Sequence, residues 1–131
     1  MTYIPTCLSI SPDGETAAVG HDGQITLVDL DPLSIVKTTS VSRQAFDIVL
    51  SSENWAYVFP EKDQWEKIRC VDLDTEIETE STGNLIYENT RARLHPSGKY
   101  IYTAVGDLEN LILQAVRQTT FMTPLIIMIT L

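Results

Sequence analysis

The stretch SPDGETAAVGHDGQITLVDLD, residues 11–31, places two tight-turn sequences around two short apolar runs. Ser11-Pro12-Asp13-Gly14 suits a tight turn, because proline presets φ at the second position and glycine readily adopts the left-handed conformation that closes it. A second turn is expected at 20–23. Strands rich in β-forming residues are expected at 7–10, 16–19, 24–29 and, after a break at 31–34, 35–39. The sequence therefore predicts a four-stranded antiparallel meander.

The same pattern recurs further along the chain. A second hairpin is expected between 46 and 59, with Asn54 in the place of Gly14, and a third between 92 and 105. The turns begin at Ser11, Ser51 and His95, which are 40 and 44 residues apart. The ending V-D-L-D at 28–31 also recurs at 71–74. A period of about 40 to 45 residues with four strands per unit is typical of β-propeller blades.

The composition of the strands supports stacked sheets. A half-exposed strand alternates apolar and polar residues, yet the runs at 17–19, 56–59 and 100–102 are apolar at successive positions. Each sheet is therefore expected to be covered on both faces, as blades are by their neighbours. The predicted fold is all-β, with four-stranded antiparallel meander blades of a partial β-propeller. An antiparallel sandwich built from irregular hairpins is the alternative.

The repeat resembles a known group of propellers. The first unit resembles the WD-repeat-like and YVTN-type repeats of bacterial proteins. The resemblance is carried by I-S-P-D-G at 10–14, the apolar residues after it, a Gly-Asp-Gly-like turn, and I-T-L-V-D-L at 25–30. Val28-Asp29 and Val71-Asp72 stand where the WD class has Trp-Asp, so the resemblance is to the broader group and covers residues 7 to about 105. It implies a propeller fold and a location at the cell surface or in the envelope.

The repeats divide the chain into 1–45 and 46–86 as blades, 87–116 as an incomplete blade, and 117–131 as an atypical apolar tail with no counterpart in earlier units. Because a propeller needs at least about four blades, this ring cannot close by itself. One hypothesis is that the chain is truncated, with a tail from a disrupted reading frame. The other is that it completes the ring by oligomerising, and self-association through uncovered blade faces is expected in either case.

Composition excludes some partners. The 131 residues carry 18 acidic and 9 basic side chains, a net charge of -9, which repels phosphate backbones and anionic lipid surfaces. Nucleic acid is therefore not an expected partner. No secretory signal is visible at the N-terminus, and the apolar run 121–131 has 11 residues, whereas a membrane-spanning helix needs about 20.

The candidate ligand-binding residues lie in loops expected at one end of the blades. The loop from Pro60 to Glu66 offers a tryptophan, whose flat apolar surface suits a sugar or a peptide. A tryptophan folded over the blade edge is the alternative, and the residues of the 20–23 turn are expected to be solvated turn residues rather than ligands. The candidates are His21, Asp22, Glu61, Lys62, Asp63 and Trp65.

No catalytic residue, cofactor or metal site is predicted. The acid pairs Asp29/Asp31 and Asp72/Asp74 could hold a hard cation, but carboxylates also bind the free amides of turns. Cys7 and Cys70 are expected too far apart for an intramolecular disulfide. The sequence lacks the G-x-S-x-G, P-loop, G-x-G-x-x-G and H-E-x-x-H motifs.

These observations favour a non-catalytic propeller piece that acts as a binding platform for a protein or carbohydrate. One alternative is a fragment of a propeller enzyme whose catalytic residues lie elsewhere, such as a lactonase or a quinone- or haem-dependent dehydrogenase. Another alternative is a cytoplasmic scaffold. The propeller fold is shared by all three classes, so the fold does not choose among them.

Overall fold

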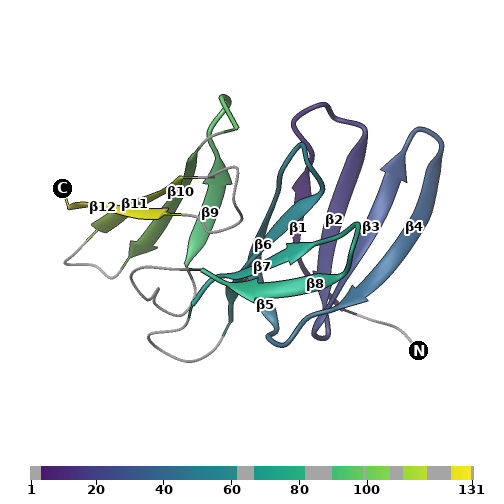
Figure 1. Cartoon of the computed structure of the whole chain (residues 1–131), viewed down its shortest axis with the longest axis horizontal. Coiled ribbons are helices and arrows are strands. Elements are labelled where there is room, and N and C mark those ends of the chain that lie inside the picture. Colours follow the sequence, from purple (N-terminus) through teal and green to yellow (C-terminus); the bar gives the residue numbers. More distant parts are fainter. Residues whose placement is uncertain are drawn as a thin grey trace.

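A computed structural model describes residues 4–61, 67–81, 90–98, 100–106, 111–117 and 125–130, with side chains as far as Ala104. The described residues form strands and turns (Figure 1). Within them, no helix is long and apolar enough to cross a membrane.

The strands form three antiparallel sheets of four, each in chain order. Sheet 1 comprises β1 (Pro5–Ile10), β2 (Thr16–His21), β3 (Gln24–Leu30) and β4 (Leu33–Ser40). Sheet 2 comprises β5 (Ala45–Leu50), β6 (Trp55–Pro60), β7 (Arg69–Asp72) and β8 (Ile77–Glu80). Sheet 3 comprises β9 (Arg91–Leu94), β10 (Tyr100–Gly106), β11 (Leu111–Arg117) and β12 (Leu125–Thr130). The predicted all-β class with four-stranded meander sheets is confirmed.

The repeated turns have the conformations that their sequences predict. Gly14, Asn54 and Gly98 have φ values of 77°, 57° and 72°, the left-handed region that glycine and asparagine tolerate. The Gly14 amide donates to the Ser11 carbonyl at 2.9 Å, and the Gly98 amide donates to the His95 carbonyl at 2.8 Å. Asn54 therefore takes the place of glycine in the second unit, as the repeat predicted.

The end of the chain differs from the expectation. The segment Leu125–Thr130 lay in the tail that was expected to have no counterpart, yet it pairs with β11 as the fourth strand of sheet 3. Its sequence, LIIMIT, is rich in β-branched residues, which favour strands even without the V-D-L-D ending of the earlier units. Sheet 3 therefore has four strands, whereas the domain boundaries at residues 45, 86 and 116 stay predictions.

Sheet 2 lies between the other two sheets (Figure 1). Its first strand, β5, contacts β1 and β2 on one side and β9 on the other. The apolar core is accordingly divided by sheet 2. One cluster joins sheets 1 and 2 and includes Ala18, Ile25, Leu27, Ile48, Leu50 and Val58. The other joins sheets 2 and 3 and includes Val49, Tyr57, Phe59, Cys70, Ala92 and Ile101.

Side chains on the first strands of the sheets link one sheet to the next. The Leu50 amide on β5 donates to Ser9 Oγ on β1 at 2.9 Å. The Ala92 amide on β9 donates to Asp47 Oδ2 on β5 at 2.8 Å. Asp47 is buried and also accepts from Arg93 Nη1 at 3.1 Å. Because a buried backbone amide needs an acceptor, these side chains favour one alignment of neighbouring first strands.

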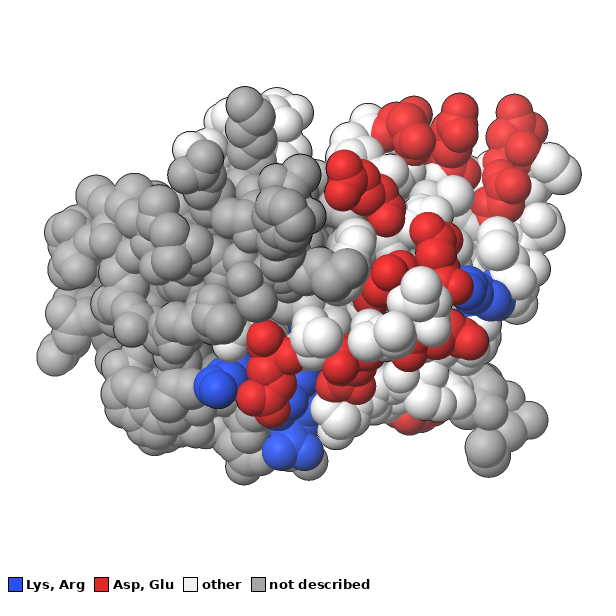
Figure 2. Space-filling model, in the orientation of Figure 1, with Lys and Arg blue, Asp and Glu red and all other residues white. Residues whose placement is uncertain are grey.

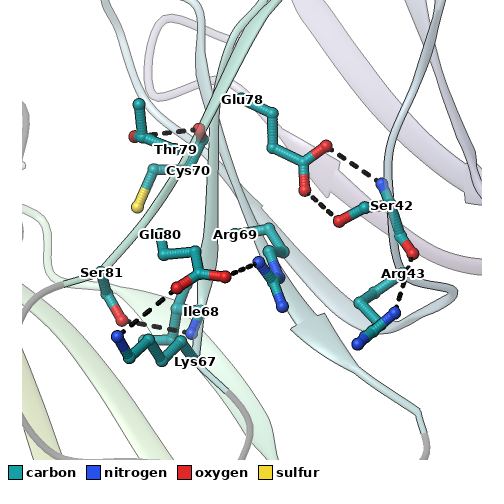
Figure 3. A network of polar contacts seen from close by, with 10 residues as sticks. All are labelled: Ser42, Arg43, Lys67, Ile68, Arg69, Cys70, Glu78, Thr79, Glu80 and Ser81. Atoms are coloured by element: carbon teal, nitrogen blue, oxygen red, sulfur yellow. Dashed lines mark hydrogen bonds and ion pairs between the residues drawn. The ribbon is translucent and has the colours of Figure 1, made fainter.

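A second set of polar contacts joins the outer part of sheets 1 and 2 (Figure 3). Glu78 on β8 accepts hydrogen bonds from both the amide and the hydroxyl of Ser42, which precedes β5. Glu76 accepts from the Thr39 hydroxyl at 3.1 Å. Within sheet 2, Glu80 pairs with Arg69 and, at 3.4 Å, with Lys67. The Glu76 and Glu78 contacts therefore hold the end of β4 and the β4–β5 connection against β8 and the turn that precedes it.

Candidate functional site

The first two candidate residues, His21 and Asp22, lie at the end of β2 and in the turn that follows it. Asp22 and Gly23 have φ values of 41° and 71°, as in a two-residue hairpin turn that requires left-handed residues. Asp22 is exposed, as expected of a turn residue. His21 is not, because β2 extends to include it and it pairs with Gln24. Its side chain is only 7% exposed, so the expectation of a solvated histidine is wrong.

His21 lies on the face of sheet 1 that points away from sheet 2. Its Nε2 is 2.6 Å from Thr26 Oγ1, which in turn is 3.0 Å from Thr38 Oγ1. This chain of polar atoms crosses β2, β3 and β4 at one end of the sheet. Because alternate residues of a strand share a face, His21 lies on the same face as Val19 and Ala17. His21 is therefore a buried residue of strand β2 and not a residue of the exposed turn.

Gln44 joins the loops that carry the candidate residues. Its side-chain Oε1 accepts from the Gly23 amide at 2.8 Å, and its carbonyl accepts from the Glu61 amide at 3.0 Å. The Val41 amide also donates to the Gly23 carbonyl at 2.9 Å. Three segments, the β2–β3 turn, the β4–β5 connection and the start of the loop after β6, are therefore fixed to one another.

The structure thus brings two of the predicted residues to a common neighbour. Asp22 precedes Gly23, whose amide donates to the Gln44 side chain, and Glu61 donates its own amide to the Gln44 carbonyl. Lys62, Asp63 and Trp65 lie outside the described residues. Sequence reasoning placed Gln44 in a loop but did not single it out, because its role depends on two segments that lie 21 and 17 residues away.

The opposite end of sheets 1 and 2 is acidic. Figure 2 shows acidic side chains over the hairpin turns at this end. The turn segments 11–15, 29–32, 51–54 and 72–76 contain no lysine or arginine. Their acidic residues are Asp13, Glu15, Asp29, Asp31, Glu53, Asp72, Asp74 and Glu76. Such a concentration of one sign of charge attracts cations and basic partners and repels anionic ones.

Several of these carboxylates bind turn amides. Asp29 Oδ1 accepts from the Asp31 amide at 3.1 Å, and Asp72 Oδ1 accepts from the Asp74 amide at 2.9 Å. Asp13 accepts from the Ser11 hydroxyl at 2.5 Å and from the Glu15 amide at 2.9 Å. These two contacts, the hydroxyl first, lower the pKa of Asp13 below its usual value of 3.8. In both acid pairs the first aspartate therefore has a role in the turn itself.

A groove runs along the first strands of the three sheets. It has a volume of about 390 Å³ and is lined mostly by apolar side chains. Its lining residues are Leu8, Ser9, Ile10, Ile48, Val49, Ala92, Arg93 and Leu94. Arg93 is the charged residue of this lining, and its guanidinium is paired with Asp47. Sequence reasoning did not find the groove, because it exists only where β1, β5 and β9 lie side by side.

The two cysteines lie on opposite sides of sheet 2. Cys7 packs against the core between sheets 1 and 2, and Cys70 belongs to the core between sheets 2 and 3. Both are free thiols, which confirms the prediction that they form no disulfide. Burial raises the pKa of Cys7 and raises that of Cys70 to about 12. Neither thiol has the lowered pKa that marks a reactive cysteine.

No protein-family model matches the chain, and no curated protein matches it. Solved structures share its fold. Kluyveromyces lactis Hsv2 is similar with a TM-score of 0.72 and 12% sequence identity, over 98% of this chain and 38% of that one. Kuenenia stuttgartiensis hydrazine synthase is similar with a TM-score of 0.68 and 16% identity, over 96% of this chain and 37% of that one.

The chain thus spans well under half the length of these structural neighbours. At such low identity the likeness concerns the fold and not the function. The neighbours are β-propellers, and this chain has the same succession of four-stranded antiparallel sheets. The chain therefore has the fold of part of a β-propeller, with three successive four-stranded antiparallel sheets.

Proposed function

We propose that this chain is a non-catalytic part of a propeller that binds a protein or carbohydrate ligand at the end carrying Asp22 and Glu61. The observation that carries the proposal is the contact made by Gln44, which joins the β2–β3 turn at Gly23 to Glu61, directly after β6. Backbone segments that such contacts already hold lose less conformational entropy when a ligand binds to them. The adjoining segment 62–66 supplies Lys62, Asp63 and Trp65.

The kind of ligand follows from the side chains. Trp65 offers a flat apolar surface on which a sugar ring or an aliphatic side chain can stack, and the charged residues around it offer hydrogen bonds. We infer that the repeats belong to the WD-like or YVTN-type group and that the whole protein acts at a bacterial surface. Both inferences rest on the resemblance of the repeat sequences.

The experiment uses tryptophan fluorescence as a reporter. The chain has two tryptophans, so a Trp55→Phe variant carries Trp65 as its single fluorophore. This variant would be titrated with a panel of oligosaccharides and with a panel of soluble peptides. Saturable change in the fluorescence with one panel would identify the ligand class. No response to either panel would contradict the proposal.

Three variants then locate the site. Trp65→Ala is expected to weaken binding at least about tenfold, as the loss of an aromatic anchor does. Asp22→Asn keeps a residue that tolerates positive φ and removes the charge. Gln44→Ala removes the acceptor for the Gly23 amide and is expected to weaken binding several-fold through loosened loops. Glu53→Gln, at the opposite end, is the matched control and should leave the affinity unchanged.

The enzyme alternative makes a different prediction. One structural neighbour is an enzyme by its name, hydrazine synthase, and the other neighbour carries no activity in its name, so the fold is compatible with either class. Lactone hydrolysis and quinone-dependent oxidation would be assayed with the protein. Turnover that survives Trp65→Ala and Gln44→Ala would favour the enzyme.

A further inference from the structure

The groove along β1, β5 and β9 has no part in the function proposed above. A propeller arranges its four-stranded sheets around a central channel. The first strands are where the three sheets come close together, because β5 contacts both β1 and β9. These strands therefore line the channel side of the structure. A further blade would pack against the face of a sheet, so it would border this groove and not fill it.

The lining of the groove is apolar, with hydrogen-bond donors at its polar positions. Six of its eight lining residues are apolar, and none of the eight carries a carboxylate. Arg93 has donors only. Ser9 Oγ accepts from the Leu50 amide and still has its own proton to donate. A ligand of this groove therefore has to bring both apolar surface and hydrogen-bond acceptors.

Arg93 is held in place beside the groove. Its Nη1 donates to Asp47 Oδ2 at 3.1 Å and to the Ala92 carbonyl at 2.6 Å. Asp47 also accepts from the amides of Ile48 and Ala92, so its charge is shared among three donors. These contacts use only Nη1 of Arg93, and its side chain is 77% exposed. The ion pair thus orients the guanidinium and leaves Nε and Nη2 for a ligand.

A second guanidinium lies on the same strand. Arg91 and Arg93 are alternate residues of β9 and so share a face. The guanidinium carbon of Arg91 lies 4.2 Å from the centre of the Phe46 ring on β5, a contact that favours this position of the cation. Both cations therefore lie beside β5, in a chain whose net charge is -9. The local charge is opposite to that of the whole chain, which favours an anionic ligand here.

We propose that this groove binds an aliphatic carboxylate, with the carboxylate at Arg93 and the hydrocarbon chain along Leu8 and Leu94. The Nε and Nη2 donors of one arginine match the two oxygens of a carboxylate. The volume of about 390 Å³ is in the usual range of small-molecule sites. The groove shares no residue with the end that carries Asp22 and Glu61, so this proposal does not depend on the ligand proposed there.

Calorimetric titration with octanoate is the first measurement. Octanoate is expected to bind with a Kd of about 1 mM or below. Between butanoate and octanoate, each added methylene should tighten binding by up to about fourfold, because it is buried in the groove. The uncharged 1-octanol should bind more weakly than octanoate. No saturable heat with octanoate, or equal affinity for butanoate or for 1-octanol, would overturn the proposal.

A charge substitution tests the position of the carboxylate. Arg93→Gln is expected to weaken octanoate binding at least about tenfold, because it removes hydrogen bonds between charged groups. Lys67→Gln is the matched control, since it removes the same charge from the ion pair with Glu80, outside the groove. The control should bind like the wild type. Equal losses in the two variants would overturn the assignment, because only net charge would then matter.

A second pair of variants tests the groove without disturbing the ion pair of Arg93. Leu8 is 59% exposed, so Leu8→Gln is expected to fold normally and to weaken octanoate binding several-fold with little effect on butanoate. Ile77→Gln is the matched control, because Ile77 is 58% exposed but lies on β8, outside the groove. The urea midpoints of both variants check their folding. An unchanged affinity of Leu8→Gln for octanoate would overturn the placement of the hydrocarbon chain.

Discussion

Ile48 and Ile10 lie on corresponding faces of corresponding strands, β5 and β1, yet Ile48 is 1% exposed and Ile10 is 55% exposed. Both residues are isoleucines. In each strand the side chain points away from the sheet that follows along the chain. The difference arises because sheet 1 covers Ile48, whereas no described residue covers Ile10 in the same way. Burial in this fold is therefore a property of the neighbouring sheet.

The largest expected effect comes from truncating these two isoleucines. Ile48→Ala is expected to lower the free energy of unfolding by about 2–5 kcal/mol, because it leaves a cavity in a packed core. Ile10→Ala should cost much less when the chain is monomeric. Urea unfolding at a concentration where light scattering shows a monomer measures both. Equal losses would mean that Ile10 is covered as fully as Ile48 within one chain, contrary to the comparison.

The two hydrogen bonds that join a backbone amide of one sheet to a side chain of the next also differ in burial. Asp47→Ala leaves the buried Ala92 amide without its acceptor and is expected to cost roughly 1–3 kcal/mol. Ser9→Ala removes a neutral acceptor from the Leu50 amide, at a half-buried position, and should cost less. Chemical denaturation of both variants gives the order. A larger loss for Ser9→Ala would contradict the expectation that the contact between Asp47 and the Ala92 amide contributes more to stability.

Close packing between sheets 1 and 2 depends on the absence of a side chain at residue 20. A Cβ on Gly20 would lie 2.6 Å from Cys7 Sγ and 3.0 Å from Ala45 Cβ. Gly20→Ala is expected to cost about 1–3 kcal/mol through overpacking. In a Cys7→Ala background the nearest atom is gone, so the same substitution should cost less. A double-mutant cycle measures the coupling, and purely additive losses would contradict the contact.

The smallest expected effect is that of an exposed ion pair on sheet 2. A hydrogen bond from Arg69, together with Lys67, lowers the pKa of Glu80 below its usual 4.5. The charged form is thus favoured by folding, so its contribution is present above pH 4.5 and is lost as the pH falls through the lowered pKa. Glu80→Gln should therefore shift the urea midpoint slightly at pH 7 and not at pH 3.

A control for that experiment is Glu53→Gln, which removes a carboxylate from an exposed turn without an ion pair to a described residue. It should show no comparable pH-dependent difference from the wild type. If Glu80→Gln and Glu53→Gln behaved alike at both pH values, the effect would reflect net charge and not the contact between Glu80 and Arg69.

Much of the fold could be predicted because its determinants are local. Gly14, Asn54 and Gly98 adopt the left-handed conformation that their turns require, and the β-branched runs between them form strands. The 40-residue spacing then predicted successive four-stranded sheets. The fourth strand of sheet 3 was missed because it lacks the repeat's ending and is recognised only by its pairing with β11.

The candidate site could be predicted only in part. The sequence placed Asp22 and Glu61 in loops at the same end, and the structure joins both loops through Gln44. It also suggested a solvated His21, which the extended β2 strand instead buries beside Thr26. Loop length and composition indicate where a chain turns, but not how far a strand continues before it does.

The amino-acid sequence by itself determined the turns, the strands, the period of the repeat and the acidic character of one end, because each follows from neighbouring residues along the chain. Only the tertiary structure decided that Ile48 is buried and Ile10 exposed, that Asp47 accepts from Ala92, and that the first strands enclose a groove. These outcomes join residues about 40 positions apart, and they depend on whether a second sheet is present to exclude water from a given face.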